Sequence, residues 1–276
     1  MSVELVIRDG NPYWYLSPDI WVVPGSDPTG SPGSPVAGQP AYVWANVENN
    51  GTDDAPGVVV QFWWANPSLQ VTRSNATLIG TANTDVPAGG SQQVLCLVPW
   101  TPVMVNGGHE CLIAVAVDPA DPLPNPLPDA FDPIAYPQVA QKNLTVLATG
   151  GMMLHWPLTI GGLLRVDKDV VVQAEIGGEL DEIYLSRLGL RGLRPAAHTA
   201  VEVGIHREPQ SCEAKDQFGV HKLQLKVPRG TNKAVYASIR AAKLAQDEYQ
   251  LVRFTEHDGK NVTGGLAYVV IAERKE

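Results

Sequence analysis

Hydrophobic and polar residues alternate along several short stretches of the first half of the chain, and this alternation predicts β-strands. The alanines and valines of residues 41–48 (AYVWANVE) share one face, and residues 58–64 (VVVQFWW) place Val58, Val60 and Phe62 together. Further strand candidates follow at short spacing, at residues 76–82, 91–98, 109–118 and 139–148. Short strands separated by Gly-, Pro- and Asn-rich turns are typical of an antiparallel β-sandwich.

A second set of strand candidates begins after the sequence TGGMML (149–154), where lysine and arginine become more frequent. The candidates are residues 154–160, 169–176, 181–188, 199–206, 221–227, 234–244, 249–256 and 266–273. Residues 234–244 are ambiguous, because their alanines also tolerate a helix. The pattern therefore predicts an all-β chain with two antiparallel β-sandwich domains in series, residues 36–150 and 151–276. Residues 1–35, aromatic and rich in Gly and Pro, are expected to pack on the first domain.

Composition and charge limit the classes of partner. The 276 residues include 26 Gly and 23 Pro, which is too many for a helical protein of this length. A net charge of −9 argues against binding nucleic acid, which requires clustered lysine and arginine. No signal peptide and no apolar stretch long enough to span a membrane is recognisable. The expected location is extracellular or on a particle rather than cytoplasmic, by an export route that the sequence does not show.

The segment DPADPLPNPLPDAFDP (118–133) separates two strand candidates and carries most of the candidate metal ligands. Prolines cannot donate to a central ladder, so the segment is expected to be a stiff connection within the first domain. Oxygen ligands of the kind calcium prefers come from Asp118, Asp121, Asp129 and Asp132. Their spacing matches no EF-hand, and no glutamate is available to close the site, so no cofactor or metal is expected.

Catalytic motifs are missing from the sequence. The chain has no Gly-x-Ser-x-Gly elbow and no phosphate-binding loop, and its histidines are scattered. Cys212 lies in a polar stretch with only Lys215 nearby as a cation that could lower its pKa. Cys96 and Cys111 both have the alternation of inward-facing residues, so they are either buried free thiols or a disulfide between neighbouring strands. The prediction is a protein without catalytic activity.

Aromatic residues form the first candidate interaction surface. If the valines of the first two strands point inward, then Tyr42, Trp44 and Trp63 point outward. Exposing three such rings together to water is unfavourable, because each carries a large apolar surface. We expect the N-terminal segment, through Trp14 or Trp21, to cover them. A partner chain or a stacked sugar ring are the alternatives.

The sequence LSRLGLRGLRP (185–195) forms the second candidate surface. Its leucines are difficult to bury in a hairpin tip, and Arg and apolar residues together are typical of protein interfaces. The stretch is interpreted either as a loop packed on its own sandwich or as a docking loop. The residues involved would be Arg187, Leu190, Arg191, Leu193 and Arg194.

Residues 36–148 resemble a CARDB-like domain, a cell-adhesion-related, immunoglobulin-like module of bacterial proteins. The resemblance rests on PVAGQPAYVWANVENNGTDDAPGVVVQFWWA, VPAGGSQQVLCLVPWTP, GGHECLIAVAVDP and AQKNLTV in this order. It implies an immunoglobulin-like fold and a structural or adhesive role. It departs before the last strand, where the proline-rich run replaces the acidic, Asn-rich segment that such domains often carry.

These observations predict a non-catalytic structural or protein-interaction module, a subunit of a larger bacterial assembly. Its partners would be other protein chains, including a second copy of itself. A carbohydrate-binding module that uses outward-facing Trp and Tyr is the first alternative. An enzyme without a recognisable motif is the second.

Overall fold

The computed structural model describes residues 2–10, 12–66, 71–103, 111–149, 153–161, 165–210, 218–241 and 243–273. The chain is an all-β protein, as the alternation predicted, and it forms two compact units. Unit 1 contains Met1–Asn66, Val71–Asn143 and Glu182–Arg191. Unit 2 is formed mainly by Leu144–Asp181 and Gly192–Glu276. The division therefore falls at Asn143 rather than at residue 150, and one short segment of the second half belongs to unit 1.

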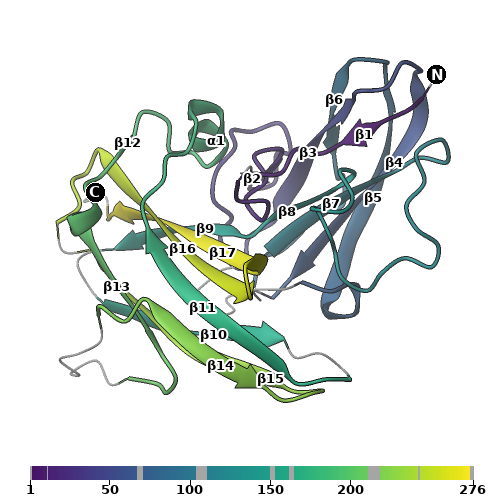
Figure 1. Cartoon of the computed structure of the whole chain (residues 1–276). Helices are drawn as coiled ribbons and strands as arrows, with labels where there is room; N and C mark the ends of the chain where they lie inside the picture. The colour runs from purple at the N-terminus through teal and green to yellow at the C-terminus, as the bar shows by residue number, and fades with distance from the viewer. Residues whose placement is uncertain are drawn as a thin grey trace. The chain divides into compact units, whose positions relative to one another are not determined.

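Two antiparallel sheets form unit 1 (Figure 1). In the first, β3 (Ala41–Asn49) pairs with β1 (Leu5–Val6), β2 (Ile20–Pro24) and β6 (Ser91–Leu95). The second has the order β5-β4-β7-β8, with β5 at Ala76–Val86, β4 at Ala55–Ala65, β7 at Cys111–Val117 and β8 at Val139–Lys142. A short 3-10 turn, Arg73–Asn75, precedes β5.

The main core of unit 1 lies between these two sheets. Val43 and Val47 of β3 meet Val58, Val60 and Phe62 of β4 there, all almost completely buried. These are the faces that the alternation predicted to point inward. The sheets bury one face each, so their outer faces lie on opposite sides of the sandwich.

A second, smaller core covers the outer face of the β5-β4-β7-β8 sheet. Cys111, Ile113 and Val115 of β7 contact Phe131 of the Asp-Pro segment in this core. The alternation predicted that Cys96 and Cys111 both face inward, as buried free thiols or as a disulfide, and both are buried. Cys96 belongs to the core between the sheets, whereas Cys111 belongs to the core outside them, and both are free thiols.

Unit 2 also contains two sheets that enclose one core. The first has the order β10-β15-β13, with β10 at Met153–Gly161, β15 at Asn232–Ala241 and β13 at Val201–His206. The second has the order β14-β11-β16-β17-β9. Its strands are β14 (Lys222–Val227), β11 (Lys168–Ile176), β16 (Glu248–Asp258), β17 (Asn261–Ala272) and β9 (Leu144–Thr149). Trp156, Phe254 and Tyr268 pack edge to face in the core.

Two pairings in unit 2 depart from a purely antiparallel arrangement. β17 pairs with β9 in parallel, and β12 (Arg194–Pro195) pairs in parallel with β16. A 3-10 turn, His198–Ala200, precedes β13. The ambiguous residues 234–244 are mostly strand β15.

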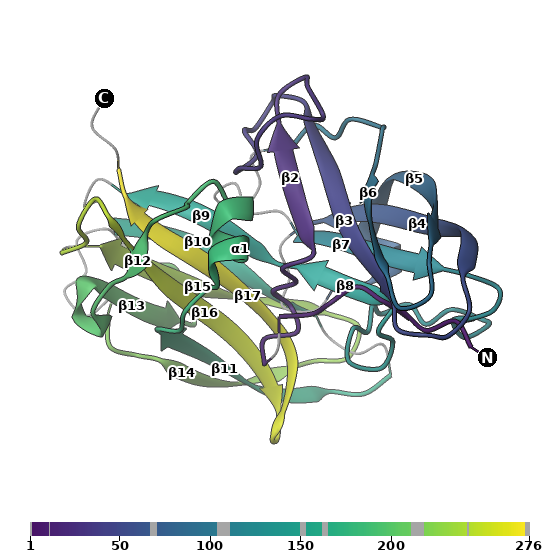
Figure 2. The same ribbon diagram turned by 90° about the horizontal axis from the view of Figure 1, so that it is seen from above.

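Residues 181–188 were predicted as a strand but instead contain the helix α1 (Glu182–Arg187). The helix belongs to unit 1 and is seen next to β2 in Figure 2. Tyr184, Leu185 and Leu188 recur at helical spacing and are buried. Gly189 ends the helix with a φ of +72°, and the N–H of Leu190 donates to the carbonyl of Leu185 at 2.8 Å. This is a Schellman termination, which needs the left-handed conformation that glycine tolerates. No helix in the described part of the chain is long and apolar enough to cross a membrane.

Candidate functional site

The aromatic residues predicted to share one surface lie on two different sheets. Tyr42 and Trp44 belong to β3, whereas Trp63 belongs to β4 of the opposite sheet. Each points away from the main core, so the two sets are on opposite outer faces of the sandwich. Alternation gives the face that a residue takes within its strand, but it does not say which strands share a sheet. The five aromatics therefore do not form one patch.

Trp44 is covered on one side by Trp21, its cross-strand neighbour on β2. The two rings are stacked, with centroids 5.8 Å apart and an interplanar angle of 11°. The indole N–H of Trp44 donates to the carbonyl of Pro28 at 3.0 Å. The Gly- and Pro-rich segment after β2 thus packs against Trp44, which follows it in the chain.

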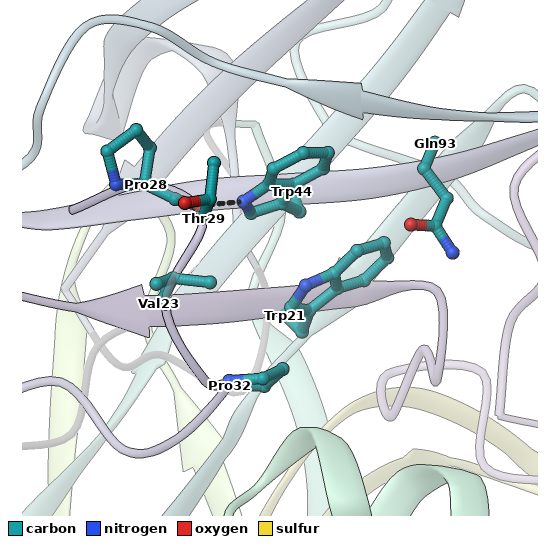
Figure 3. Close-up of a pocket in the computed structure, with 8 residues that line it drawn as sticks. Trp21, Val23, Pro28, Thr29, Pro32, Trp44 and Gln93 are labelled. Carbon is teal, nitrogen blue, oxygen red and sulfur yellow. Dashed lines mark hydrogen bonds between the residues drawn. The ribbon is translucent and has the colours of Figure 1, made fainter.

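A hollow of 280 Å³ remains beside the stacked tryptophans (Figure 3). Its lining combines indole faces with the side chains of Val23, Pro28 and Pro32, and it carries polar groups from Thr29 and Gln93. Half-buried Trp44 forms part of its wall. The hollow is apolar with a few polar groups at its margin, which is the composition of a small-molecule or peptide subsite.

Trp63 is covered by the Asp-Pro segment instead of by the N-terminal residues. Phe131 packs edge-on to Trp63 with centroids 5.8 Å apart, and the guanidinium of Arg73 lies 4.4 Å from the Phe131 ring centre. Trp14 packs edge-on against Tyr15 at 5.5 Å, in the N-terminal segment. Phe131 of the proline-rich segment therefore covers part of the outer face of the β5-β4-β7-β8 sheet.

The four aspartates of this segment bind backbone groups at separate places. Asp118 accepts from the Ala120 N–H at 2.7 Å, and Asp121 accepts from the Leu5 N–H at 2.8 Å. The carboxylate of Asp129 accepts from the N–H and hydroxyl of Ser74, both at 2.9 Å. Asp132 accepts from the Ala135 N–H at 3.0 Å. These bonds anchor the loop, and the described residues contain no group of three or more His, Cys, Asp or Glu side chains suited to a metal.

The predicted docking loop is divided between the two units. Arg187 and the buried Leu190 belong to unit 1, where Arg187 binds Asp19 and lies 4.3 Å from the Trp21 ring centre. Arg191 makes only an exposed 3.6 Å pair with Glu182. In unit 2, half-buried Leu193 precedes Arg194, which binds Asp247 and Glu248 at 2.9 and 3.1 Å. Arg187 and Leu190 thus pack within unit 1, whereas Arg191, Leu193 and Arg194 are at least partly exposed, and the docking role of the loop stays a prediction.

Asp19 is the buried anchor of α1. It also receives two hydrogen bonds from Arg8, each 2.7 Å long. Burial alone would raise the pKa of Asp19, but the hydrogen bonds and charges of Arg8 and Arg187 outweigh it and hold that pKa below its usual value. The two arginines thus favour the ionised form of the Asp19 carboxylate.

An open edge of unit 1 is the feature that the sequence reading missed. β5 pairs only with β4, and β6 pairs only with β3, among the described strands. Exposed apolar side chains gather beside them: Leu78, Leu97 and Val98 are 45%, 73% and 48% exposed. A groove of 240 Å³ runs between residues 81–84 of β5 and the β6 region, with Leu97 in its wall. An uncharged edge of this kind is visible in the sequence only once strand pairing is known.

Groups with catalytic potential are few in the described residues. His155 Nδ1 lies 2.9 Å from the Ser238 hydroxyl, and the His155 ring stacks on Tyr236. Burial and the charge of His206 lower the pKa of His155. Lys168 and Glu256 form a buried ion pair inside unit 2, which Thr263 joins at 2.9 Å. Cys212, the cysteine weighed as a nucleophile, lies outside the described residues.

Comparisons with known proteins give no family. No family model and no curated protein matches the chain. Among solved structures, a red sea bream transglutaminase is 13% identical with a TM-score of 0.24, over 93% of this chain and 32% of that one. A Kluyveromyces marxianus β-glucosidase is 15% identical with a TM-score of 0.23, over 46% of this chain and 14% of that one. A structure titled CBD12 from CALX1.2 is 9% identical with a TM-score of 0.20, over 80% and 76% of the two chains. The chain thus spans at most a third of the two enzymes.

Proposed function

We propose that the chain is a non-catalytic protein-interaction module, immunoglobulin-like in unit 1 and similar to CARDB domains, that docks a neighbouring protein through the open edge formed by β5 and β6. The observation that carries this proposal is the set of exposed apolar side chains at that edge, where Leu97 is 73% exposed. Unpaired backbone N–H and C=O groups at an edge strand bind an extended segment of another chain, and pockets for alternate side chains give selectivity.

The internal covering of the aromatics supports a protein partner at the edge rather than at the tryptophan faces. Trp21 is only 6% exposed, and Trp63 lies under Phe131. The edge, in contrast, combines backbone hydrogen-bonding groups with a groove and with apolar side chains that water solvates poorly. These are the features that strand addition by an extended segment uses.

The test selects extended peptides on the edge. A displayed library of random nonapeptides is panned against the wild-type chain, against Thr81→Lys on β5, and against Gln224→Lys on β14 as a matched control. Peptides rich in β-branched residues should bind the wild type and the control but not Thr81→Lys, because a lysine on the edge disfavours strand addition. Equal enrichment on all three proteins, or on none, would refute the proposal.

A second candidate function is carbohydrate binding at the hollow beside Trp21 and Trp44. The observation favouring it is the combination of indole faces with the Gln93 amide and the Thr29 hydroxyl around a space of 280 Å³. A sugar ring could stack on the aromatic wall while the polar groups bind its hydroxyls. Retardation in gels containing polysaccharides tests this: Trp44→Ala should abolish it, while Trp63→Ala, where Phe131 covers the ring, should not.

A further inference from the structure

The strand β5 is an edge strand of the described residues that has no protection against pairing. It is eleven residues long and carries no lysine, arginine or proline. Its single charge, Asp85, lies near its end and accepts the Gly57 N–H at 2.8 Å. Natural sheets usually protect long edges with lysines, prolines or a covering segment, because unprotected edges pair with other chains.

Several other edges in the described part of the chain show such protection. β14 alternates exposed Lys222 and Lys226 along its free side, and β10 contains Pro157. β8 is covered by the N-terminal segment, where the Ser17 N–H donates to the Gln141 carbonyl at 2.8 Å. β13 receives the N–H of Gly219 on its Val203 carbonyl at 3.0 Å. The edge strands β6 and β9 are also bare, but they are only five and six residues long. β5 is thus the longest bare edge among the described strands, and a long bare edge favours pairing with another chain.

We propose that β5 pairs with β5 of a second copy of this chain, antiparallel and about a two-fold axis near Thr81. This rests on the proposed function and names its partner. The two-fold axis of such a pair must place one residue opposite its own copy. Thr81 is the middle residue of Ala76–Val86, so centring the pair there places both strands side by side, with the bulge at Ile79 interrupting the ladder once on each side of the axis.

The sequence of β5 is complementary to itself in this register. Asp85 of one copy lies near Ala76 and Thr77 of the other, so the acidic groups are at opposite ends of the pair and do not face each other. Thr81 faces its own copy, and threonine pairs are favourable across antiparallel strands. Like charges directly opposite would oppose pairing, and none occur here.

The apolar side chains beside β5 extend the contact beyond the backbone. Val98 packs so closely on Gly80 that a side chain at that glycine would lie 2.9 Å from a Val98 methyl carbon. The missing side chain therefore lets the segment after β6 approach β5 and adds the exposed Leu97 and Val98 to the same edge. A second copy seated on β5 would remove these groups from water together with Leu78.

The experiment measures association of the full chain by sedimentation over a wide concentration range. A dimer is expected whose dissociation constant falls as salt rises, because each copy carries a net charge of −9 and salt screens their repulsion. Thr81→Lys should raise the dissociation constant by about 100-fold or more, since the two lysines would face each other across the axis. Gln224→Lys on β14, equal in charge change, should leave it unchanged.

Cross-linking tests the register independently of stability. Facing residues in antiparallel strands have Cα atoms about 4.5–5.5 Å apart, a separation that a disulfide spans. In a Cys212→Ser background, Thr81→Cys should oxidise to a covalent dimer, and Gln224→Cys should not. A chain that stays monomeric at high concentration would overturn self-pairing. The edge could then still bind another protein, and the peptide selection tests that. A dimer indifferent to Thr81→Lys, or equal cross-linking at both positions, would show that another surface mediates association.

Discussion

The guanidinium of Arg187 lies 2.8 Å from the carboxylate of Asp19, although 168 residues separate them in the chain. The Asp19 side chain is completely buried, and Arg187 also contacts the Trp21 ring. This ion pair and the buried leucines beside it hold the short helix α1 on the N-terminal part of unit 1.

Replacing Arg187 with alanine should lower the free energy of unfolding by about 2–4 kcal/mol, because it leaves a buried carboxylate with Arg8 as its remaining cationic partner and removes the contact with Trp21. Chemical denaturation measures this change. Arg191→Ala is the matched control: its pair with Glu182 is exposed, so the change should stay within about 0.5 kcal/mol. Equal effects of the two substitutions would contradict the anchoring role of Arg187.

Lys142 gives unit 1 a pH dependence on the alkaline side. Burial, and to a smaller extent the charge of Arg187, lowers the pKa of Lys142 to about 7. The unfolded chain keeps this proton up to a pH of about 10.4, so between these values the unfolded state binds more protons and stability rises with pH. Below pH 7 both states are protonated, and this contribution no longer varies.

Lys142→Met should remove that rise and stabilise the chain at neutral pH by about 1–3 kcal/mol, because the cost of burying a charged ammonium disappears. Urea unfolding between pH 6 and pH 10 measures both effects. Lys260→Met, at an exposed turn, should leave the profile as it is. A wild-type stability that does not change across this range would count against the burial of Lys142 in its neutral form.

Phe131→Ala should uncover Trp63. The ring is buried against Trp63 and Arg73, and removing a buried phenylalanine costs about 3–5 kcal/mol. Tryptophan emission should shift to the red, and a hydrophobic dye should bind. Leu127→Ala in the same segment, where the leucine is 46% exposed, should change little. Unchanged emission in Phe131→Ala would mean that another group covers Trp63.

Calcium and chelators should leave the melting temperature unchanged, because the aspartates of the Asp-Pro segment accept separate backbone hydrogen bonds. A bound ion at a hundredfold excess over its dissociation constant would add about 2.7 kcal/mol to the free energy of unfolding. Calorimetry with and without millimolar calcium decides this. A rise of several degrees would show that the loop rearranges around an ion.

Alternation along the sequence was a good guide to which residues of a strand face the core. It placed Val58, Val60 and Phe62 correctly in the interior of unit 1. It could not assign strands to sheets, because pairing depends on residues far away in the chain. Trp44 and Trp63 were therefore predicted together and lie apart.

The error at residues 181–188 has a different physical origin. Tyr184, Leu185 and Leu188 fit a strand and a helix almost equally well over so short a stretch. The helix is favoured because these three side chains are buried within unit 1 and because a glycine can end it with a left-handed backbone conformation. Likewise, β5 is an edge strand because no described strand pairs with its second side. The local sequence of a strand does not show whether it will have one neighbour or two.

The return of residues 182–191 to unit 1 also affects how the protein can be divided. A gene fragment that stops at residue 143 encodes both sheets of unit 1 but lacks the helix that covers Trp21, and a fragment that starts there carries the helix without its binding surface. A protease that cuts once between the units would leave them joined non-covalently through this segment. Recombination at that boundary would damage both products, so the two sandwiches are expected to be inherited as one gene segment.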